Sequence, residues 1–177
     1  MTPTISRRDE VFTTPYFKLV GKHLAGAAEA DPFYALDLPD YVSIVAQTAD
    51  GDLVLVRQFR PAVETVTLEL PAGLVDAGDT PENTAKRELR EETGFVAERV
   101  TLVSCMKTDT GRLSNRMWVY FAPDVVRDAA LMPEPGMEVV VQTRTQVSRS
   151  LADGSFDHAL HVAALLLAVQ LGHLSLS

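Results

Sequence analysis

The chain has 177 residues, of which 46% are hydrophobic and 23% are charged, and its formal net charge is −8. This length and composition predict one globular domain with a substantial core and, at most, a small appendage. The acidic balance argues against non-specific binding to nucleic acid or to an anionic membrane, so an anionic substrate would require local basic residues or bound cations.

The single cysteine, Cys105, cannot form an intramolecular disulfide, which fits a reducing compartment. It lies in the apolar stretch LVSCM, which favours a buried core position over a reactive thiol. The N-terminal segment MTPTISRRDEVF shows no apolar run typical of a secretory signal. We therefore expect a cytoplasmic protein.

Strand patterns dominate the first half of the chain. Residues 11–24 are rich in β-forming residues and are interrupted by Pro15, which favours an edge strand or a hairpin. A loop follows, with Gly26, Asp31 and Pro32. Further strand patterns lie at residues 41–48, 52–59, 65–71, 100–106, 116–123 and 137–143.

The hydrophobic period changes to that of a helix in residues 80–94. Thr80 is a candidate N-cap, Pro81 suits the first helical position, and Gly94 suits the stop. Two more helices are expected at residues 145–154 and 156–172. Strands, a helix, more strands and two final helices predict an α+β fold with a mixed sheet rather than a regular βαβ series.

Three acids, Glu88, Glu91 and Glu92, share one face near the C-terminal end of the first expected helix. Like charges at this spacing destabilise a helix, and the negative end of the helix dipole adds to the cost. The glycine-containing loop ELPAGLVDAGDTP lies upstream and can bring backbone carbonyls close to a ligand.

Carboxylates and carbonyls are the ligands that Mg²⁺ and Mn²⁺ prefer, so bound cations would relieve the repulsion between these acids. The alternative is a solvated acidic face paired with Lys86, Arg87 and Arg90.

The string from Gly73 to Phe95 resembles the Nudix box, G-x5-E-x7-R-E-U-x-E-E-x-G-U, where U is a bulky apolar residue. Every fixed position matches except Asp79, where the family has Glu. The resemblance implies an α+β fold of the α/β/α sandwich type: a mixed β-sheet, a loop–helix–loop box and an N-terminal β-strand extension. We expect residues 41–177 to form the Nudix hydrolase domain and residues 1–40 to form an N-terminal strand region that takes part in dimerisation.

Nudix enzymes use divalent cations to hydrolyse nucleoside diphosphates linked to another moiety. The resemblance therefore implies Mg²⁺ or Mn²⁺, as two or three ions. It assigns metal-ligand or catalytic roles to the Ala72 carbonyl, Arg87, Glu88, Glu91 and Glu92, with Arg87 orienting the acids. The shorter side chain of Asp79 puts the supporting contact at that position in question.

A second stretch, VRQFRPAVETVTLELPAG, resembles the ADP-ribose and nucleotide-sugar pyrophosphatases. In that subfamily the counterparts of Arg60 and Glu69 contact the substrate or the metal site, and an arginine can hold a phosphate through two hydrogen bonds. The alternative is an ion pair of Arg60 with Glu64 or Glu69 that stiffens the sheet. The C-terminal stretch DGSFDHALHVAALLLA resembles the same subfamily, whose members are commonly dimers completed by N-terminal strands, so we expect a homodimer.

The proline-glycine turn of many ADP-ribose hydrolases is missing, because Thr110 precedes Gly111. The loop offers four substrate-binding candidates for a phosphate, a ribose or a sugar, and a solvated tight turn is an equally weighted alternative. These candidates are Asp109, Arg112, Asn115 and Arg116.

The catalytic base of relatives often comes from the loop before the last strand. Glu134 and Glu138 are the candidates, with Glu138 slightly favoured, and a plain polar loop position is the alternative. His158 and His161 lie three residues apart on the last helix, but without a third ligand nearby a zinc site is not expected.

The sequence therefore predicts hydrolysis of the pyrophosphate bond of ADP-ribose or a related nucleoside diphosphate sugar. The products would be a nucleoside monophosphate and a sugar phosphate, and the small-molecule substrate would be the principal partner. The alternatives are a nucleoside triphosphate or dinucleoside polyphosphate pyrophosphohydrolase and a non-catalytic nucleotide-binding Nudix module.

Overall fold

The computed structural model describes residues 2–27 and 31–176. The chain forms two compact units. Unit 1 comprises Met1–Asp40 and Lys107–Arg116, and unit 2 comprises Tyr41–Met106 and Met117–Ser177. The segment Lys107–Arg116 thus belongs with the N-terminal strands, although it lies between two strands of the second unit in sequence.

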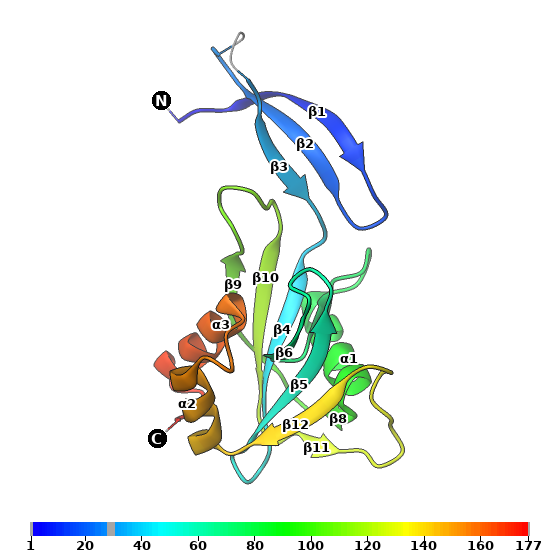
Figure 1. Cartoon of the computed structure of the whole chain (residues 1–177), viewed down its shortest axis with the longest axis vertical. Coiled ribbons are helices and arrows are strands. Elements are labelled where there is room, and N and C mark those ends of the chain that lie inside the picture. Colours follow the sequence, from blue (N-terminus) through cyan, green and yellow to red (C-terminus); the bar gives the residue numbers. More distant parts are fainter. Residues whose placement is uncertain (1, 28–30, 177) are drawn as a thin grey trace. The chain divides into compact units, whose positions relative to one another are not determined.

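Unit 1 is built on an antiparallel sheet of the strands β1 (Ile5–Thr13), β2 (Lys18–Leu24) and β3 (Phe33–Asp37) (Figure 1). Pro15 lies in the hairpin turn between β1 and β2, where its missing N–H costs no sheet hydrogen bond. Strand β3 was not expected from the sequence. The Leu36 N–H donates to the Arg112 carbonyl at 2.7 Å, and the Ser114 N–H donates to the Leu36 carbonyl at 3.0 Å, which attaches the 107–116 segment to β3.

Unit 2 is built on a seven-stranded mixed sheet with the order β12-β5-β4-β10-β9, in which β6 pairs with β5 and β7 pairs with β4. Strands β4 and β10 run parallel, whereas β12–β5, β4–β5, β4–β7 and β5–β6 are antiparallel pairs. The strands are β4 (Tyr41–Gln47), β5 (Leu53–Arg60), β6 (Thr65–Glu69), β7 (Ala72–Leu74), β9 (Thr101–Lys107), β10 (Arg116–Ala122) and β12 (Glu138–Gln142). Two short strands, β8 (Phe95–Val96) and β11 (Val126–Arg127), pair with each other.

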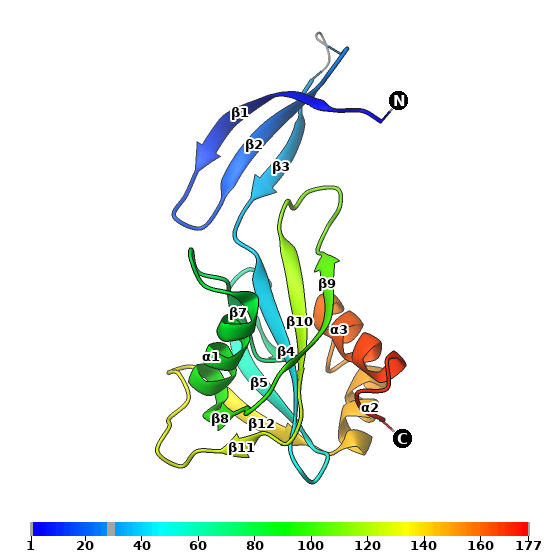
Figure 2. The same cartoon turned by 180° about the vertical axis from the view of Figure 1, so that it is seen from behind.

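Helices cover both faces of this sheet. Helix α1 (Pro81–Thr93) packs on one face, and α2 (Arg144–Asp153) and α3 (Ala159–Gln170) pack on the other (Figures 1 and 2). The layers therefore form the mixed α/β/α sandwich that was expected.

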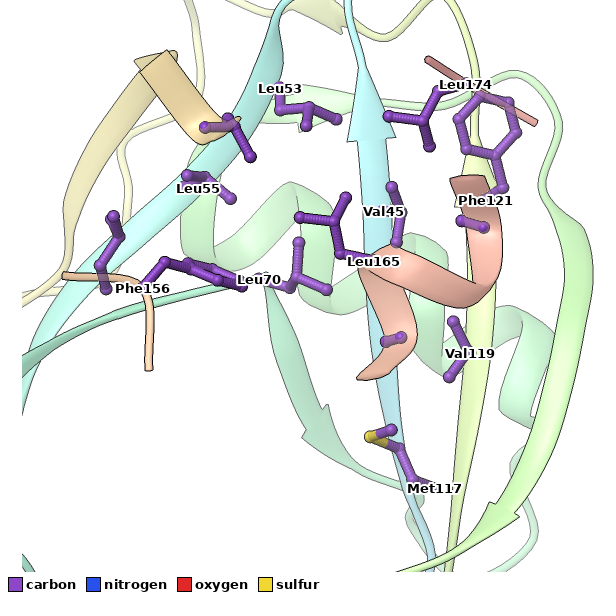
Figure 3. Close-up of a cluster of buried hydrophobic side chains, with 14 residues drawn as sticks. Val45, Leu53, Leu55, Leu70, Met117, Val119, Phe121, Phe156, Leu165 and Leu174 are labelled. Carbon is purple, nitrogen blue, oxygen red and sulfur yellow. The ribbon is translucent and has the colours of Figure 1, made fainter. Parts of the chain in front are cut away.

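Each face of the sheet has its own hydrophobic core. Along β4, Val42 and Ile44 point into the cluster that contains Leu89 of α1, whereas Val45 points into the cluster that contains Leu165 of α3. This alternation follows from the two-residue period of a strand. Figure 3 shows the second cluster, with Leu165 beside Val45 and Leu70.

The expected burial of Cys105 is wrong, because this cysteine is exposed. It lies on β9, which ends the strand order of the sheet, and the side chains of an edge strand are less enclosed. Within residues 2–27 and 31–176, no helix is long and apolar enough to span a membrane.

Candidate metal and pyrophosphate site

Helix α1 begins and ends where its sequence predicts. The Thr80 side chain caps the helix by accepting the Asn83 N–H, and Gly94 closes it in the left-handed conformation with φ 66°. Asp79 accepts the Thr80 N–H at 2.7 Å and the Thr84 hydroxyl at 3.1 Å. These contacts lower the pKa of Asp79, and the hydrogen bond from the Thr80 backbone has the largest effect. The shorter acid at this position of the box therefore holds the start of α1.

Glu92 is the most buried of the three helix acids, with 4% of its surface exposed. Its Oε2 accepts the Ala72 N–H at 2.9 Å, which links the end of α1 to β7. Burial, reinforced by the charges of Glu88 and Glu134, raises the pKa of Glu92 to about 8, although the Ala72 N–H and the Arg60 charge oppose the shift. The backbone of Ala72 and the carboxylate of Glu92 thus lie together in an electrostatically negative site.

Glu88 lies directly against the glycine that begins the box. A Cβ atom at Gly73 would lie 2.0 Å from the carboxyl carbon of Glu88, so a side chain there would displace this acid. Burial, together with the charges of Glu91 and Glu134, raises the pKa of Glu88. The charge of Arg87 opposes this shift without cancelling it. Clustered carboxylates beside a backbone segment form a donor set that fits a hard divalent cation.

Arg87 bridges the acids of the box. Its Nη1 lies 2.9 Å from Glu88 Oε1 and 3.0 Å from Glu91 Oε2, and its Nη2 lies 3.2 Å from Asp76 Oδ2 in the preceding loop. One guanidinium therefore contacts two of the three acids and the loop that precedes the helix.

Arg60 and Glu69 form a two-point ion pair, which is the contact proposed by the alternative interpretation of Arg60. Arg60 Nε and Nη2 donate to the two oxygens of Glu69 at 2.8 and 2.7 Å, and the Thr67 hydroxyl donates to Oε1 at 2.6 Å. Burial alone would raise the pKa of Glu69, but these hydrogen bonds outweigh it and lower the value to about 2. Glu69 is fully buried, whereas the Arg60 side chain is 42% exposed and its Nη1 is not part of the pair. Glu69 therefore fixes the Arg60 guanidinium and is itself closed off from solvent.

Of the two candidate bases, the structure brings Glu134 to the box. The Glu134 N–H donates to the Glu91 carbonyl at 3.1 Å, and its negative charge contributes to the raised pKa values of Glu88 and Glu92. Glu138 instead lies on β12 opposite Arg57, and its carboxylate contacts that arginine at 3.1 Å.

A residue that the sequence analysis did not identify, Arg127, anchors the end of α1. Its guanidinium donates to the carbonyls of Thr93 and Leu131 and lies 5.7 Å from the centre of the Phe95 ring. The contact with Thr93 spans 34 positions, so no local pattern could have predicted it. A cation at the C-terminal end of α1 offsets part of the repulsion among the acids there.

The four loop candidates belong to unit 1, whereas the box belongs to unit 2. Asp109 accepts the Gly111 N–H at 2.8 Å, which gives the tight turn of the alternative interpretation. Asn115 is buried and uses both ends of its amide, with Thr108 and with the Pro39 carbonyl. Arg112 and Arg116 are exposed, and the Arg116 side chain contributes to a cavity of about 310 Å³ within unit 1.

The α/β/α sandwich with a glycine-bordered cluster of helix acids defines a Nudix-type hydrolase of pyrophosphate bonds. Residues 37–155 match the NUDIX domain, so the chain belongs to the Nudix family. Members of this family generally depend on divalent metal ions.

Two curated relatives and one solved structure extend this result. The chain is 31% identical over 140 residues to an ADP-ribose pyrophosphatase of Bacillus subtilis, a match that covers 75% of this chain and 76% of the relative. It is 29% identical over 127 residues to the ADP compounds hydrolase NudE of Escherichia coli, covering 70% and 67%. The crystal structure of an ADP compounds hydrolase superposes with a TM-score of 0.80 at 26% identity, covering 96% of this chain and 94% of that one.

Proposed function

We propose that this chain hydrolyses the pyrophosphate bond of ADP-ribose or of a related nucleoside diphosphate sugar, giving a nucleoside monophosphate and a sugar phosphate. The observation that carries the proposal is the convergence of Glu88 and Glu92 on the Ala72–Gly73 strand, with the charge of Arg60 acting on Glu92. The names of the relatives identify ADP-containing pyrophosphates as their substrates, and this supports the substrate class.

The metal ligands in this proposal are Glu88, Glu91, Glu92 and the Ala72 carbonyl, and the ions are Mg²⁺ or Mn²⁺, two or three in number. When bound, such ions neutralise the developing negative charge on the pyrophosphate and lower the pKa of a coordinated water. The protein keeps the acids in place through Arg87 and through the Ala72 N–H. Arg60, held by Glu69, would bind a phosphate oxygen through Nη1.

Glu134 is the proposed general base. Water adds to one phosphorus, the bridging P–O bond breaks, and Glu134 accepts the proton that the water loses. Its backbone hydrogen bond to Glu91 supports this assignment, because it ties the loop to the helix that carries the acids.

The first test measures phosphate release, after coupling to a phosphatase, with Mg²⁺ or Mn²⁺ on a panel of substrates. The panel holds ADP-ribose, ADP-glucose, UDP-glucose, GDP-mannose, diadenosine polyphosphates and nucleoside triphosphates. We expect a clear preference for ADP-ribose or one nucleotide sugar. A preference for triphosphates would contradict the substrate class, and binding without hydrolysis under either metal would indicate a non-catalytic module.

The second test replaces Glu92 by Gln. The amide oxygen can still accept the Ala72 N–H, and burial already disfavours the charged form of this carboxyl, so the fold and the melting temperature should be retained. We expect turnover to fall by about two orders of magnitude or more. Glu98→Gln, an exposed glutamate just beyond the box, is the matched control and should keep normal turnover. Near-normal activity of a folded Glu92→Gln protein would contradict the proposed metal site.

The assembly that we propose is a homodimer formed through unit 1. Phe12 and Tyr34 lie on the same face of the β1–β3 sheet, and both are more than half exposed. Exposed apolar side chains gathered on one sheet face are typical of an interaction surface. Sedimentation velocity should show that Phe12→Ser combined with Tyr34→Ser weakens the dimer, whereas Phe33→Ser, on the opposite face, should have less effect.

The cytoplasmic location stays a prediction from the sequence.

A further inference from the structure

His161 is a buried polar residue of α3 that contacts the segment leading into the metal site. Its side chain is 1% exposed, and its Nδ1 accepts the Leu70 N–H at 3.2 Å across 91 positions of sequence. Leu70 lies between β6 and β7, two residues before Ala72. Helix α3, on one face of the sheet, thus holds the segment that leads to Ala72. The Ala72 N–H in turn is hydrogen-bonded to Glu92 of α1, which lies on the other face.

The same imidazole also adjoins the ion pair that orients Arg60. His161 Nδ1 lies 3.8 Å from Glu69 Oε2, and that oxygen accepts Arg60 Nη2 at 2.7 Å. Burial, together with neighbouring His158, lowers the pKa of His161 to about 3, so the ring is neutral at physiological pH. With the Leu70 N–H on Nδ1, the proton of the neutral ring lies on Nε2.

The alternative interpretation of this cluster is a metal site. Glu69, His158 and His161 each offer one ligand atom, and these atoms lie within 4.8 Å of one another. Their donor atoms are already in use. Both oxygens of Glu69 are bonded to Arg60, His161 Nδ1 is bonded to Leu70, and His158 Nδ1 accepts the His161 N–H at 3.4 Å. The two rings are stacked at 3.9 Å, and the Arg60 cation adjoins the same carboxylate, which opposes a second cation.

We propose that His161 is a positioning residue for pyrophosphate hydrolysis, which sets the Ala72 carbonyl through its hydrogen bond with Leu70 and packs beside Glu69, the partner of Arg60. This inference rests on the ligand role of Ala72 and the phosphate role of Arg60 in the proposed function. A displacement of about 1 Å in a positioned group can cost on the order of 10²-fold in rate, so a contact outside the site can control the reaction.

The test compares three substitutions in the full chain. His161→Leu removes the acceptor, and His161→Asn places an amide oxygen near the position of Nδ1. Leu165→Ala disturbs the same helix and the core beside Leu70, but it keeps the imidazole that accepts the Leu70 N–H. For His161→Leu we expect roughly tenfold increases both in KM for the substrate and in the Mg²⁺ concentration for half-maximal activity. His161→Asn should restore both to within about threefold. Leu165→Ala should lower the melting temperature and leave both kinetic values unchanged.

Normal KM and normal Mg²⁺ dependence in folded His161→Leu would overturn the inference, and so would equal changes in Leu165→Ala. If His161→Leu does not fold, the comparison is between His161→Asn and His161→Gln, because the glutamine amide lies one methylene further out and misses the Leu70 N–H. Indistinguishable kinetics of these two variants would overturn the inference. Glu92→Gln tests the proposed function separately, so the failure of one proposal is distinguishable from the failure of the other.

Discussion

At the scale of single residues, two glycines of the box are required for different physical reasons. Gly94 adopts a positive φ of 66°, and a Cβ there would lie 1.9 Å from Arg127 Nη1. Gly73 has no positive φ, and its requirement comes from the Glu88 carboxylate that occupies the space of a side chain. The motif identifies both positions, but the reason for Gly73 is visible only in the packing.

Gly73→Ala should therefore reduce activity far more than stability. The new methyl group displaces Glu88, so we expect turnover to fall by about 10²-fold, with a loss of about 1–2 kcal/mol in the free energy of unfolding. Gly154→Ala is the matched control, because this glycine has φ 78° but no atom within 4 Å of a new Cβ. It should cost about 1 kcal/mol from backbone strain and leave turnover unchanged. Equal turnover in the two variants, measured beside urea unfolding, would contradict the crowding argument.

At the scale of elements, α1 accommodates three acids at its C-terminal end because two arginines lie against it. Arg87 contacts Glu88 and Glu91, and Arg127 bonds the Thr93 carbonyl. The sequence predicted the contribution of Arg87, which lies one residue before Glu88 and four residues before Glu91. It could not predict Arg127, which is brought to the helix by the pairing of β11 with β8.

Arg127→Ala should weaken both the end of α1 and the adjoining loop. We expect a loss of about 1–2 kcal/mol in unfolding free energy, because a charged hydrogen bond and a favourable dipole interaction are removed. Turnover should also fall, since Leu131 and Glu134 lie in the loop that Arg127 holds. Arg99→Ala removes an exposed ion pair with Asp124 at 3.6 Å and should cost at most about 0.5 kcal/mol. A thermal and kinetic comparison in which both variants behave alike would exclude the capping role.

The sequence predicted the long elements better than the short ones. Thr80, Pro81 and Gly94 marked the ends of α1, and the alternating runs marked β4, β5 and β10. The strands β3, β7, β8 and β11 were not expected. Strands β7, β8 and β11 have two or three residues, too few for a period to show, and all four are strands because a partner pairs with them.

At the scale of the whole molecule, two buried groups on the α3 side, Glu69 and His161, make the free energy of unfolding depend on pH. The pKa of Glu69 is about 2 in the folded chain against an ordinary 4.5, so its contribution is present above pH 4.5 and is lost as the pH falls toward 2. The pKa of His161 is about 3 against 6.5, so the unfolded chain binds the extra proton first, and stability falls as the pH drops below 6.5.

His161 should therefore contribute a decrease in the midpoint of urea unfolding as the pH falls below 6.5. Glu92, whose pKa is raised to about 8, opposes this decrease between pH 8 and 4.5, because the folded chain keeps that proton. His161→Asn should flatten the decrease between pH 6.5 and 4.5, because the variant has no imidazole to protonate. An unchanged slope in this range for His161→Asn would show that other groups cause the acid sensitivity.

The placement of the 107–116 segment in unit 1 was the least predictable feature of the molecule. The sequence placed Asp109, Arg112, Asn115 and Arg116 near the site by analogy with the loop of relatives. Their grouping with the N-terminal strands depends on backbone hydrogen bonds from Leu36 to residues 112 and 114, which are 76 and 78 positions away and leave no local pattern in the sequence.

The parallel pairing of β4 with β10 also determines when, during synthesis, the chain can acquire its chemistry. Residues 41–46 of β4 pair with residues 117–122, so the ribosome makes the whole box before the second strand exists. Contacts of such long sequence separation form late in folding, whereas a capped helix such as α1 forms from local contacts. The acids should thus be present in the nascent chain before the sheet that carries Ala72 is complete, and premature binding of divalent ions by an incomplete chain should be weak.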